Sequence, residues 1–489
     1  MFLTLYFPLA ASLSVPELPD DFIDKVCEGN LPAAGTQAAR WSDLSGAAAA
    51  SPYLLRLHAD MQMSLGIGDE AEEQYRRAQK AIRSPRQAIR VISCRNAGWQ
   101  ALFRHRLATG LTCFVRLIEE PDIDVAQQLE ARLGIAGSLH ELGRSRDAAD
   151  ALDELVAAAA TQASDHWREI VATMRFDVDV QRELRCAALL SDHVYWQSGL
   201  GDEALRGVGG VGGVGSAGSA SDEAVRHETE ALQVRTPLLR QRIDYLCCLR
   251  ALARGERAAM DGITAHLAWA QQRGLGDYLR TTRLEVVLAA LVSDAPQLAE
   301  TLLEPLHRLD HATTTGHRQL EYLYAVAKTH QALGRSREGM ALFARYALVA
   351  AQCLRDDSHV LASCGGKGAR QAPLDDVAAR LPARYRRAYR YLQENLDRRD
   401  LSVHEVAAVV GVTERALQSA FKHSLGLSPT ELIRRLRMER IRADLLDDSF
   451  AGDRTVLSAA TRWGVQNRST LVSGYRKQFH EAPSETLER

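Results

Sequence analysis

The 489-residue sequence predicts an all-α chain in two parts, a long helical body and a shorter C-terminal unit. Ala, Leu, Arg, Glu and Gln dominate, Pro is rare, and the β-branched alternation typical of strands is scarce. One frame of small and apolar residues recurs three times in the body, and one helical pattern occurs twice near the C-terminus. These observations predict an array of helix pairs followed by a tandem helical unit.

Length and charge limit the class of protein. A chain of this length is expected to form two or three domains. Residues 383–489 contain 19 Lys and Arg and 14 Asp and Glu, a net charge of +5, and because the whole chain has a net charge of −2, the remainder carries −7. Chance fluctuation is one explanation of this asymmetry. The other is a polyanionic partner that binds the C-terminal part alone.

The N-terminal segment is apolar but lacks the features of a signal peptide. No Lys or Arg precedes Lys25, so the positive region is missing, and Pro8 interrupts the apolar run. We therefore expect an extended segment or the start of a helix that packs on the body. No run of 18 apolar residues exists, so no membrane segment is predicted. The eight cysteines show no CxxC motif, which favours free thiols and a cytoplasmic location.

A recurring frame surrounds three Leu-Gly pairs of the body. In each copy a small residue precedes the glycine by seven, a small residue follows it by five, and a large apolar residue follows it by nine. The copies are Ala59, Gly66, Ala71 and Tyr75; Ala136, Gly143, Ala148 and Leu152; and Ala327, Gly334, Gly339 and Phe343, with a broken fourth copy at residues 199–204. The frame resembles the tetratricopeptide repeat, a pair of helices whose first member ends in a left-handed glycine cap. An unspecialised helical array is the alternative. Either predicts that residues 1–355 form a regulatory scaffold that binds a protein or effector.

Two stretches interrupt the helical pattern. Half of residues 207–220 are glycines, so this stretch is expected to form a flexible surface insertion that cannot hold a helix. No strand precedes it and no Gly-Lys-Ser/Thr ends it, which excludes a phosphate-binding loop. Residues 356–382 change to Ser, Gly and charged residues and are predicted to link the body to the C-terminal unit.

No pattern in the chain indicates catalysis. His307 and His311 stand four apart, with His317 beyond, a spacing that can hold a metal, but no His-Glu-x-x-His or cysteine partner frames it. Histidines near a surface loop are the commoner explanation. We therefore predict no metal, no cofactor and no enzymatic activity.

The C-terminal unit begins with a helix over residues 384–396, with Tyr385, Tyr389 or Ala388, and Leu392 on its inner side. Residues 403–421 then read as helix, glycine turn and helix, and residues 456–475 repeat the pattern at an offset of 53 to 54. Two helix-turn-helix units in tandem are a device for reading DNA.

In the first unit, Ser402 and Glu405 form a capping box, Gly411 makes the turn, and Thr413 caps the second helix. Leu417 and Phe421 face inward. Arg415, Gln418, Ser419 and Lys422 are therefore predicted to face DNA. Arg and Gln suit guanine and adenine edges in the major groove, and Lys422 with His423 suits phosphates.

A long helix is predicted to join the two units. Ser428 and Glu431 form a capping box around Pro429, and the helix runs to about Leu446. Its buried stripe is Leu432, Leu436, Ile441 and Leu445, while Arg434, Arg435, Arg437 and Arg440 lie on other faces. About 18 residues at 1.5 Å each span about 27 Å. One turn of DNA is about 34 Å, so the helix can hold the two units at neighbouring major-groove segments.

The second unit starts at Thr455, turns at Gly464 and is capped by Asn467. Its predicted DNA-facing residues are Arg468, Ser469, Val472, Ser473 and Arg476. Gly474 lies inside the recognition helix and weakens it by about 1 kcal/mol relative to Ala. We therefore expect the first unit to determine sequence specificity and the second to add affinity and spacing.

The C-terminal residues resemble the AraC/XylS family of bacterial transcription regulators. The resemblance covers about residues 384–489 and includes Leu-Gly-Leu-Ser-Pro after the first unit and Tyr-Arg-Lys-Gln-Phe…Pro-Ser-Glu after the second. The family usually has Ile-Ala at Ala459-Ala460, Phe at Val465 and Gly at His480, so these departures predict weaker packing of the second unit. The body lacks the strands of the β-barrel ligand domain found in sugar-sensing members, so no sugar ligand is implied.

The whole chain resembles a narrower group within that family. Its length, its helical body and the segment Pro-Glu-Leu-Pro-Asp-Asp…Val-Cys-Glu-Gly-Asn at residues 16–30 are similar to the HrpB/HrpX regulators of type III secretion genes. The resemblance implies activation of promoters that carry a paired direct repeat, the plant-inducible promoter box. The expected partners are promoter DNA and RNA polymerase, with an unknown partner at the body and a homodimer as further expectations. The alternative is a helical-repeat adaptor or chaperone-binding protein that binds DNA only weakly.

Overall fold

The computed structural model describes residues 2–44, 51–82, 86–120, 123–160, 165–196, 216–307, 316–364, 380–446, 456–479 and 481–487. Every regular element in these residues is a helix, which confirms the all-α prediction. The chain divides into two compact units, one of residues 1–81 and 98–361 and one of residues 82–97 and 362–489. Helix α7, Arg86–Phe103, crosses this division. None of the helices in the described ranges is long and apolar enough to cross a membrane.

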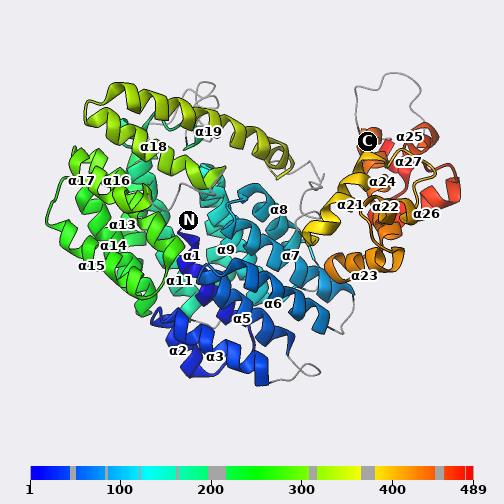
Figure 1. Cartoon of the computed structure of the whole chain (residues 1–489), viewed down its shortest axis with the longest axis horizontal. Helices are drawn as coiled ribbons and strands as arrows, with labels where there is room; N and C mark the ends of the chain where they lie inside the picture. Colours follow the sequence, from blue (N-terminus) through cyan, green and yellow to red (C-terminus); the bar gives the residue numbers. More distant parts are fainter. Residues whose placement is uncertain are drawn as a thin grey trace. The chain divides into compact units, whose positions relative to one another are not determined.

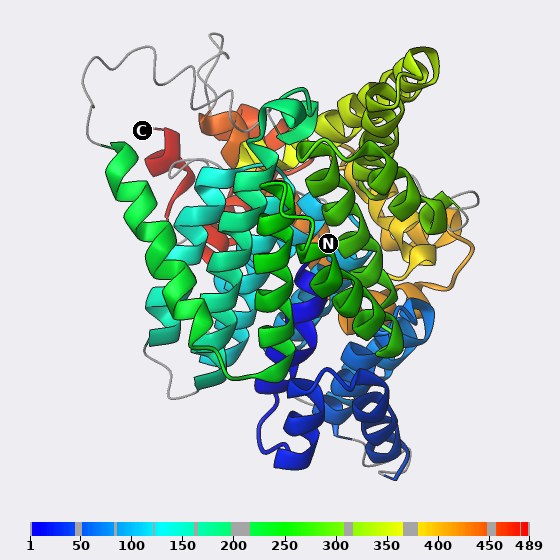
Figure 2. The same ribbon diagram turned by 90° about the vertical axis from the view of Figure 1, so that its left-hand side faces the viewer.

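The body is built from helices that pack mainly on their neighbours in the chain (Figure 1). Short turns join most successive helices, such as α9 and α10, which lie side by side, and α13 and α14 both lie beside α11 (Figure 2). The helices of this part are α1 (Leu3–Leu13), α2 (Asp20–Cys27), α3 (Leu31–Leu44), α5 (Pro52–Ser64), α6 (Gly68–Ala81), α8 (Leu107–Ile118), α9 (Val125–Glu141), α10 (Ser145–Ala160), α11 (Asp165–Arg185), the short 3-10 helix η1 (Ala188–Leu190), α13 (Ser216–Leu232), α14 (Pro237–Ala253), α15 (Ala259–Gln272), α16 (Gly276–Val292), α17 (Pro296–His307), α18 (His317–Ala332) and α19 (Ser336–Cys364).

The three complete copies of the repeated frame are helix pairs, namely α5 with α6, α9 with α10, and α18 with α19. The turn glycines Gly66, Gly143 and Gly334 have φ angles of +79°, +73° and +77°, the left-handed cap expected there. Ala59, Ala136 and Ala327 are fully buried at the helix contacts. The frame therefore predicts the helix pairs correctly, whereas membership in the tetratricopeptide class stays a prediction. The broken fourth copy lies outside the described residues.

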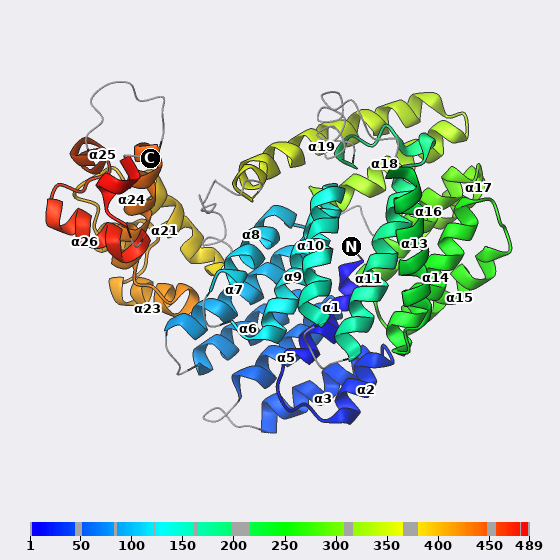
Figure 3. The same cartoon turned by 180° about the vertical axis from the view of Figure 1, so that it is seen from behind.

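Helix α1 lies in the interior of the array, in contact with α5, α9, α11 and α16 (Figures 1 and 3). Every residue from Leu3 to Ser12 is buried. At Gly137 of α9 a Cβ atom would lie 2.2 Å from Leu3, so only glycine lets α1 approach so closely. Of the two expectations for the N-terminal segment, the helix that packs on the body is confirmed.

A buried polar network joins α1 to the middle of the array. Arg242 of α14 donates to both carboxylate oxygens of Asp177 at 2.7 and 2.8 Å and to Glu285 of α16 at 2.9 and 3.0 Å. Tyr6 of α1 donates to Asp177 at 2.8 Å, and Tyr245 donates to Glu285 at 2.9 Å. Because charges taken out of water need paired partners, this network fixes the relative positions of four helices.

Two expectations about the body are corrected. Residues 207–220 were expected to form no helix, yet residues 216–220 are the first residues of α13. Most of the glycines precede residue 216, and the Ser-Ala-rich remainder has adequate helix propensity. Residues 207–215 lie outside the described part. Helix α19 continues to Cys364, beyond the expected end of the body at 355, because Ala, Leu and Val persist through residues 347–354 and 360–362.

The histidines that suggested a metal have other partners. The His307 ring lies 2.6 Å from the Tyr322 hydroxyl, and His317 lies 2.9 Å from Asp357. His311 is outside the described residues. Within the described residues no group of three or more His, Cys, Asp or Glu could hold a metal ion.

The C-terminal unit has two apolar clusters that share one helix. Its helices are α21 (Ala383–Glu394), α22 (Val403–Val409), α23 (Glu414–Leu425), α24 (Pro429–Leu446), α25 (Val456–Arg462), α26 (Arg468–Phe479) and α27 (Pro483–Leu487). Leu432 and Leu436 of α24 belong to the cluster of α21, α22 and α23, whereas Ile441 and Leu445 belong to that of α25 and α26. Figure 3 shows α24 among the helices of this unit.

Candidate nucleic-acid interface

The first helix-turn-helix unit consists of α22 and α23, joined at Gly411. The Ser402 hydroxyl accepts from the Glu405 amide at 3.1 Å, and the Thr413 hydroxyl accepts from the Ala416 amide at 3.2 Å. Each bond satisfies an amide that the helix start leaves without an intrahelical partner. Gly411 has φ +65°, which lets the chain reverse between the two helices. The predicted caps and turn are confirmed.

Only half of the expected capping box at Ser402 forms. The Glu405 carboxylate turns away from the helix start and accepts from Tyr391 at 2.5 Å and from Arg398 at 2.6 Å. These hydrogen bonds, Tyr391 first and Arg398 next, lower the pKa of Glu405. The capping-box prediction is wrong for the carboxylate because a guanidinium and a phenol brought close by the fold are stronger partners than one amide.

The predicted DNA-facing residues of α23 lie on one face. Leu417 and Phe421 are fully buried against the apolar cluster, which fixes the rotation of the helix. The exposed residues at helical spacing are Arg415, Gln418, Ser419 and Lys422. Neither Arg415 nor Lys422 forms a salt bridge with another described residue. Both cations are therefore available to an external anion.

Helix α24 positions the second unit. Ser428 and Glu431 form the complete capping box, with the Glu431 carboxylate 2.9 Å from the Ser428 amide and the Glu431 amide 3.3 Å from the Ser428 hydroxyl. The helix has 18 residues and contributes to both apolar clusters. A continuous helix is stiff over this length, so it sets the separation of the two units.

The second unit consists of α25 and α26. Asn467 caps α26 by accepting from the Ser469 amide at 2.9 Å, and Gly464 makes the turn with φ +71°. Leu471 and Tyr475 are buried, while the exposed residues of the predicted set are Arg468, Ser469, Ser473 and Arg476. Val472 is partly buried. The predicted start at Thr455 lies outside the described residues.

Side-chain hydrogen bonds within the C-terminal unit engage some of the residues that were predicted to contact DNA. The Ser469 hydroxyl donates to Asn467 at 2.6 Å, so its proton serves the helix cap. The His423 ring nitrogen Nδ1 lies 2.7 Å from the carbonyl oxygen of Ser419, so that nitrogen is engaged within α23. The Ser419 hydroxyl lies 3.3 Å from the same His423 nitrogen. The predicted residues whose side chains bond no other described residue are therefore three in each unit, namely Arg415, Gln418 and Lys422 in the first and Arg468, Ser473 and Arg476 in the second.

Comparison with known proteins agrees with this geometry. A family model described as a helix-turn-helix domain matches residues 406–489. The regulatory protein HrpB of Ralstonia nicotianae is 37% identical over 490 residues, which covers 99% of this chain and 99% of that protein. The XylDLEGF operon transcriptional activator of Pseudomonas putida is 31% identical over 103 residues, 21% of this chain and 32% of that protein.

The chain belongs to the AraC/XylS family of transcriptional regulators. A probable thc operon regulatory protein of Rhodococcus erythropolis is a further relative, 31% identical over 196 residues, or 40% of this chain and 56% of that protein. No solved structure matches the chain. The family is one of DNA-binding regulators and not of enzymes, so DNA is the partner of the C-terminal unit.

Arg437 has a role in this AraC/XylS-type unit that the sequence analysis did not identify. The sequence predicts it on a face of α24 other than the buried stripe, and its guanidinium donates to the carbonyl oxygens of Leu396 and Arg398 at 3.0 and 2.5 Å. Burial lowers its pKa. A Cβ atom on Gly464 would lie 3.0 Å from the same guanidinium. Arg437 therefore joins the loop between α21 and α22 to the turn of the second unit.

Other arginines of α24 also have partners within the unit. Arg435 pairs with Glu439 at 3.2 Å, and the Arg440 guanidinium lies 5.5 Å from the centre of the Trp463 ring. Arg434 is exposed. The charge count of the unit therefore overstates the number of cations that face outward, because several arginines hold the unit together.

Proposed function

We propose that this protein is a sequence-specific transcriptional activator whose two recognition helices, α23 and α26, occupy adjacent major-groove segments of promoter DNA. The observation that carries the proposal is that both helices are anchored on α24 with their polar faces exposed. Arg415 and Gln418 read bases, and Lys422 contacts phosphate. In the second unit Arg468, Ser469, Val472, Ser473 and Arg476 supply further contacts, chiefly for affinity and spacing.

We infer that the target genes are those of type III secretion. The full-length similarity to the regulatory protein HrpB supports this assignment, together with the resemblance of residues 16–30 to the same group. An activator must also contact RNA polymerase, so the polymerase is the expected protein partner at the promoter. The body serves as the regulatory module that responds to a protein or effector.

The test is binding of the full chain to duplexes that carry the plant-inducible promoter box, followed by base substitutions in the box. Arg415→Ala and Gln418→Ala should each cost about 1–3 kcal/mol at particular base pairs and relax the preference there. Lys422→Ala should weaken binding to all sequences alike and reduce the slope of log affinity against log salt by about 1.

Matched outcomes separate the candidate functions. If Arg415→Ala and Lys422→Ala behave alike across the base substitutions, the assignment of α23 to the groove is wrong. If the wild-type chain protects no promoter segment at low salt, the helical-repeat adaptor becomes the better description. Protection of two segments about 34 Å apart on one DNA face supports the activator.

A further inference from the structure

Helix α19, the last helix of the body, has an apolar stripe on its outward face. Met340 and Leu348 have 69% and 73% of their surface exposed, the largest values among the described large apolar residues. Ala341, Ala344 and Ala351 are also exposed between and beside them. The spacing of residues 340, 344, 348 and 351 places them along one side of the helix. The opposite side packs on α18, where the ring centres of Tyr346 and Tyr324 are 5.1 Å apart.

Such a stripe is unusual at the end of a helical array. The terminal helix of an array normally has a polar outer face, because nothing follows it to cover apolar side chains. Exposed apolar residues scattered singly need no explanation, but a contiguous row along three turns is typical of a docking surface for another helix.

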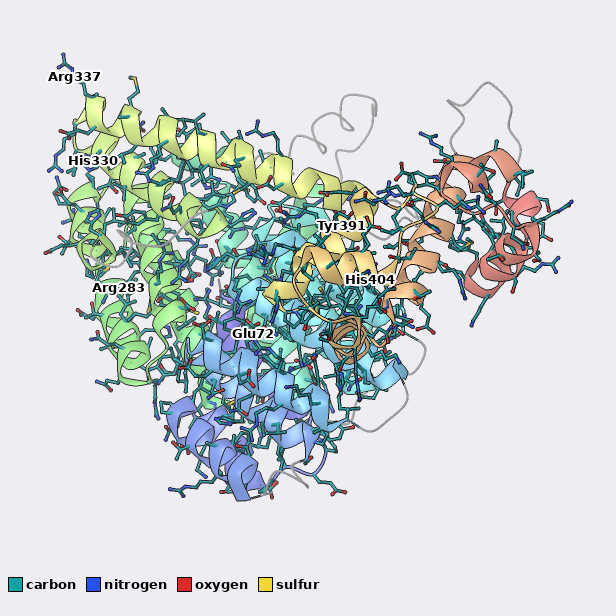
Figure 4. All side chains as sticks on the ribbon, turned by 45° about the vertical axis from the view of Figure 1, so that its right-hand side comes forward. Glu72, Arg283, His330, Arg337, Tyr391 and His404 are labelled. Atoms are coloured by element: carbon teal, nitrogen blue, oxygen red, sulfur yellow. The ribbon has the colours of Figure 1, made fainter. Side chains whose placement is uncertain are left out.

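Two exposed arginines flank the stripe and limit which kind of helix can bind there. Arg337 stands one turn before Met340 and points away from the array (Figure 4). Arg345 lies beside Ala344 at the middle of the stripe. Neither forms a salt bridge with another described residue. Glu338, in contrast, lies 3.3 Å from His330 of the same body.

These charges disfavour two occupants that the chain itself could supply. Antiparallel pairing of α19 with a second copy places the two Arg345 side chains together at the centre, and parallel pairing places the two Arg337 side chains together. Like charges held opposite each other destabilise a pair of helices. The C-terminal unit of the same chain has a net charge of +5 and would add further repulsion.

We propose that the outward face of α19 binds an amphipathic helix of another protein, with apolar residues at this spacing and acidic residues at its flanks. Met340 and Leu348 would fill gaps between the partner's apolar side chains, and Ala344 would let the two helices approach closely. Arg337 and Arg345 would meet the acidic flanks, which fixes the direction and register of the partner. The surface is small, so the complex is a transient one.

The test uses the full chain and two synthetic helical peptides of about 18 residues, enough to span the stripe. Both have leucines at the spacing of residues 340, 344, 348 and 351, and one has Glu and the other Lys at the flanks. Fluorescence anisotropy should show binding of the acidic peptide, weaker binding of the basic one, and loss of the preference as salt rises. Equal binding of the two peptides, or no binding of the acidic one, would overturn the proposal.

Variants of α19 test whether the peptide binds at the stripe. The double variant Met340→Glu with Leu348→Glu should weaken the acidic peptide at least about tenfold. Val225→Glu, on the exposed face of α13, is the matched control and should have no effect. Arg337→Glu with Arg345→Glu should reverse the preference toward the basic peptide. Unchanged binding in either double variant would place the peptide elsewhere and contradict the proposal.

The other two possible occupants, a second copy of the chain and the C-terminal unit, are tested by cross-linking. A photo-reactive phenylalanine derivative replaces Ala344, and the full chain is irradiated first without and then with the acidic peptide. Irradiated full chain should yield no specific cross-linked product, and addition of the acidic peptide should yield one with that peptide. A cross-linked dimer would identify a second copy as the occupant. Cross-links to residues 383–489 of the same chain would identify the C-terminal unit, and either result would overturn the proposal.

Discussion

At the scale of single residues, the two glycines of the second helix-turn-helix unit differ in what they provide. Gly464 has a left-handed backbone and lies against the Arg437 guanidinium, so no side chain fits without strain. Gly474 lies inside α26, and a Cβ atom there would meet Met438 at 3.4 Å, an ordinary contact distance. One glycine is required by geometry, whereas the other only weakens its helix.

The two glycines should therefore respond oppositely to alanine. Gly474→Ala should stabilise the C-terminal unit by about 0.5–1 kcal/mol, because alanine loses less backbone entropy in a helix. Gly464→Ala should destabilise it by about 1–3 kcal/mol through backbone strain and contact with Arg437. Urea unfolding of the full chain, monitored through the hydrogen exchange of α26 amides, measures the stability change of each variant. A shift in the same direction for the two variants would refute this distinction.

The buried His266 of α15 should make the stability of the body depend on pH. Its ring stacks on that of Tyr245 with the ring centres 4.5 Å apart and lies 2.8 Å from the Tyr278 hydroxyl. Burial first, and then the positive charge of Arg242, lower its pKa to about 3. In the unfolded chain the value is about 6.5. Below pH 6.5 the unfolded chain therefore binds a proton at this residue that the folded chain does not bind.

The consequence is a loss of stability on the acid side. The full contribution of neutral His266 is present above about pH 6.5, and well below that pH it should be lost at up to about 1.4 kcal/mol per pH unit. Urea midpoints measured between about pH 7 and pH 5 should fall less steeply for His266→Gln than for the wild type. Identical slopes would mean that His266 does not titrate differently in the two states.

At the scale of elements, α24 and its Arg437 determine how the two recognition helices are held. The helix contributes to two apolar clusters. Arg437 donates to two carbonyl oxygens of the loop between α21 and α22 and contacts the Gly464 turn of the second unit. The two units thus share both a core helix and a polar link. Their spacing follows from this element and not from either unit alone.

Removal of the polar link should loosen the spacing. Arg437→Met keeps the apolar stem but deletes both hydrogen bonds, and we expect a cost of about 1–3 kcal/mol in stability. The variant should also discriminate less between promoter boxes with native spacing and boxes with one base pair inserted between the repeats. Arg437→Lys retains one donor group, so its stability and its discrimination between the boxes should lie between those of Arg437→Met and the wild type. Full discrimination in Arg437→Met would assign the spacing to apolar packing only.

At the scale of the whole body, the buried network around Arg242 holds the interior helix α1 in place. Asp177 and Glu285 both depend on this one guanidinium, and Tyr6 extends the network to α1. The N-terminal helix is therefore part of the core, although it is remote in sequence from its partners. Its position depends on charges that only the folded array brings together.

Replacement of Arg242 should destabilise the body strongly. Arg242→Met leaves two buried carboxylates without their cation, and the expected cost is about 3–5 kcal/mol. Joint replacement of Arg242 by Met, Asp177 by Asn and Glu285 by Gln should recover part of that cost, because no buried charge remains unpaired. Thermal unfolding of the two variants measures the difference. A larger loss in the triple variant would show that the acids do not depend on Arg242.

The features predicted correctly from sequence are those with local causes. Ser402, Thr413, Ser428 and Asn467 cap helices within three residues of themselves, and the glycine turns follow from the left-handed backbone that they require. The exposed face of α23 follows from the periodicity that buries Leu417 and Phe421. Whether the exposed side chains read bases is a prediction that awaits the promoter measurements.

The helical class, the helix pairs and the two helix-turn-helix units can all be predicted from the sequence, since they depend on helical periodicity and on capping and turn residues that are near one another in the chain. Three features depend on contacts between distant segments: the interior position of α1, the bond of Glu405 to Arg398 in place of its own helix start, and the link that Arg437 makes between the two units. The tertiary structure also determines that Met340 and Leu348 are exposed, because the end of the array lies there. The physical reason is that burial and ion pairing between distant segments depend on how helices pack, which no local pattern specifies.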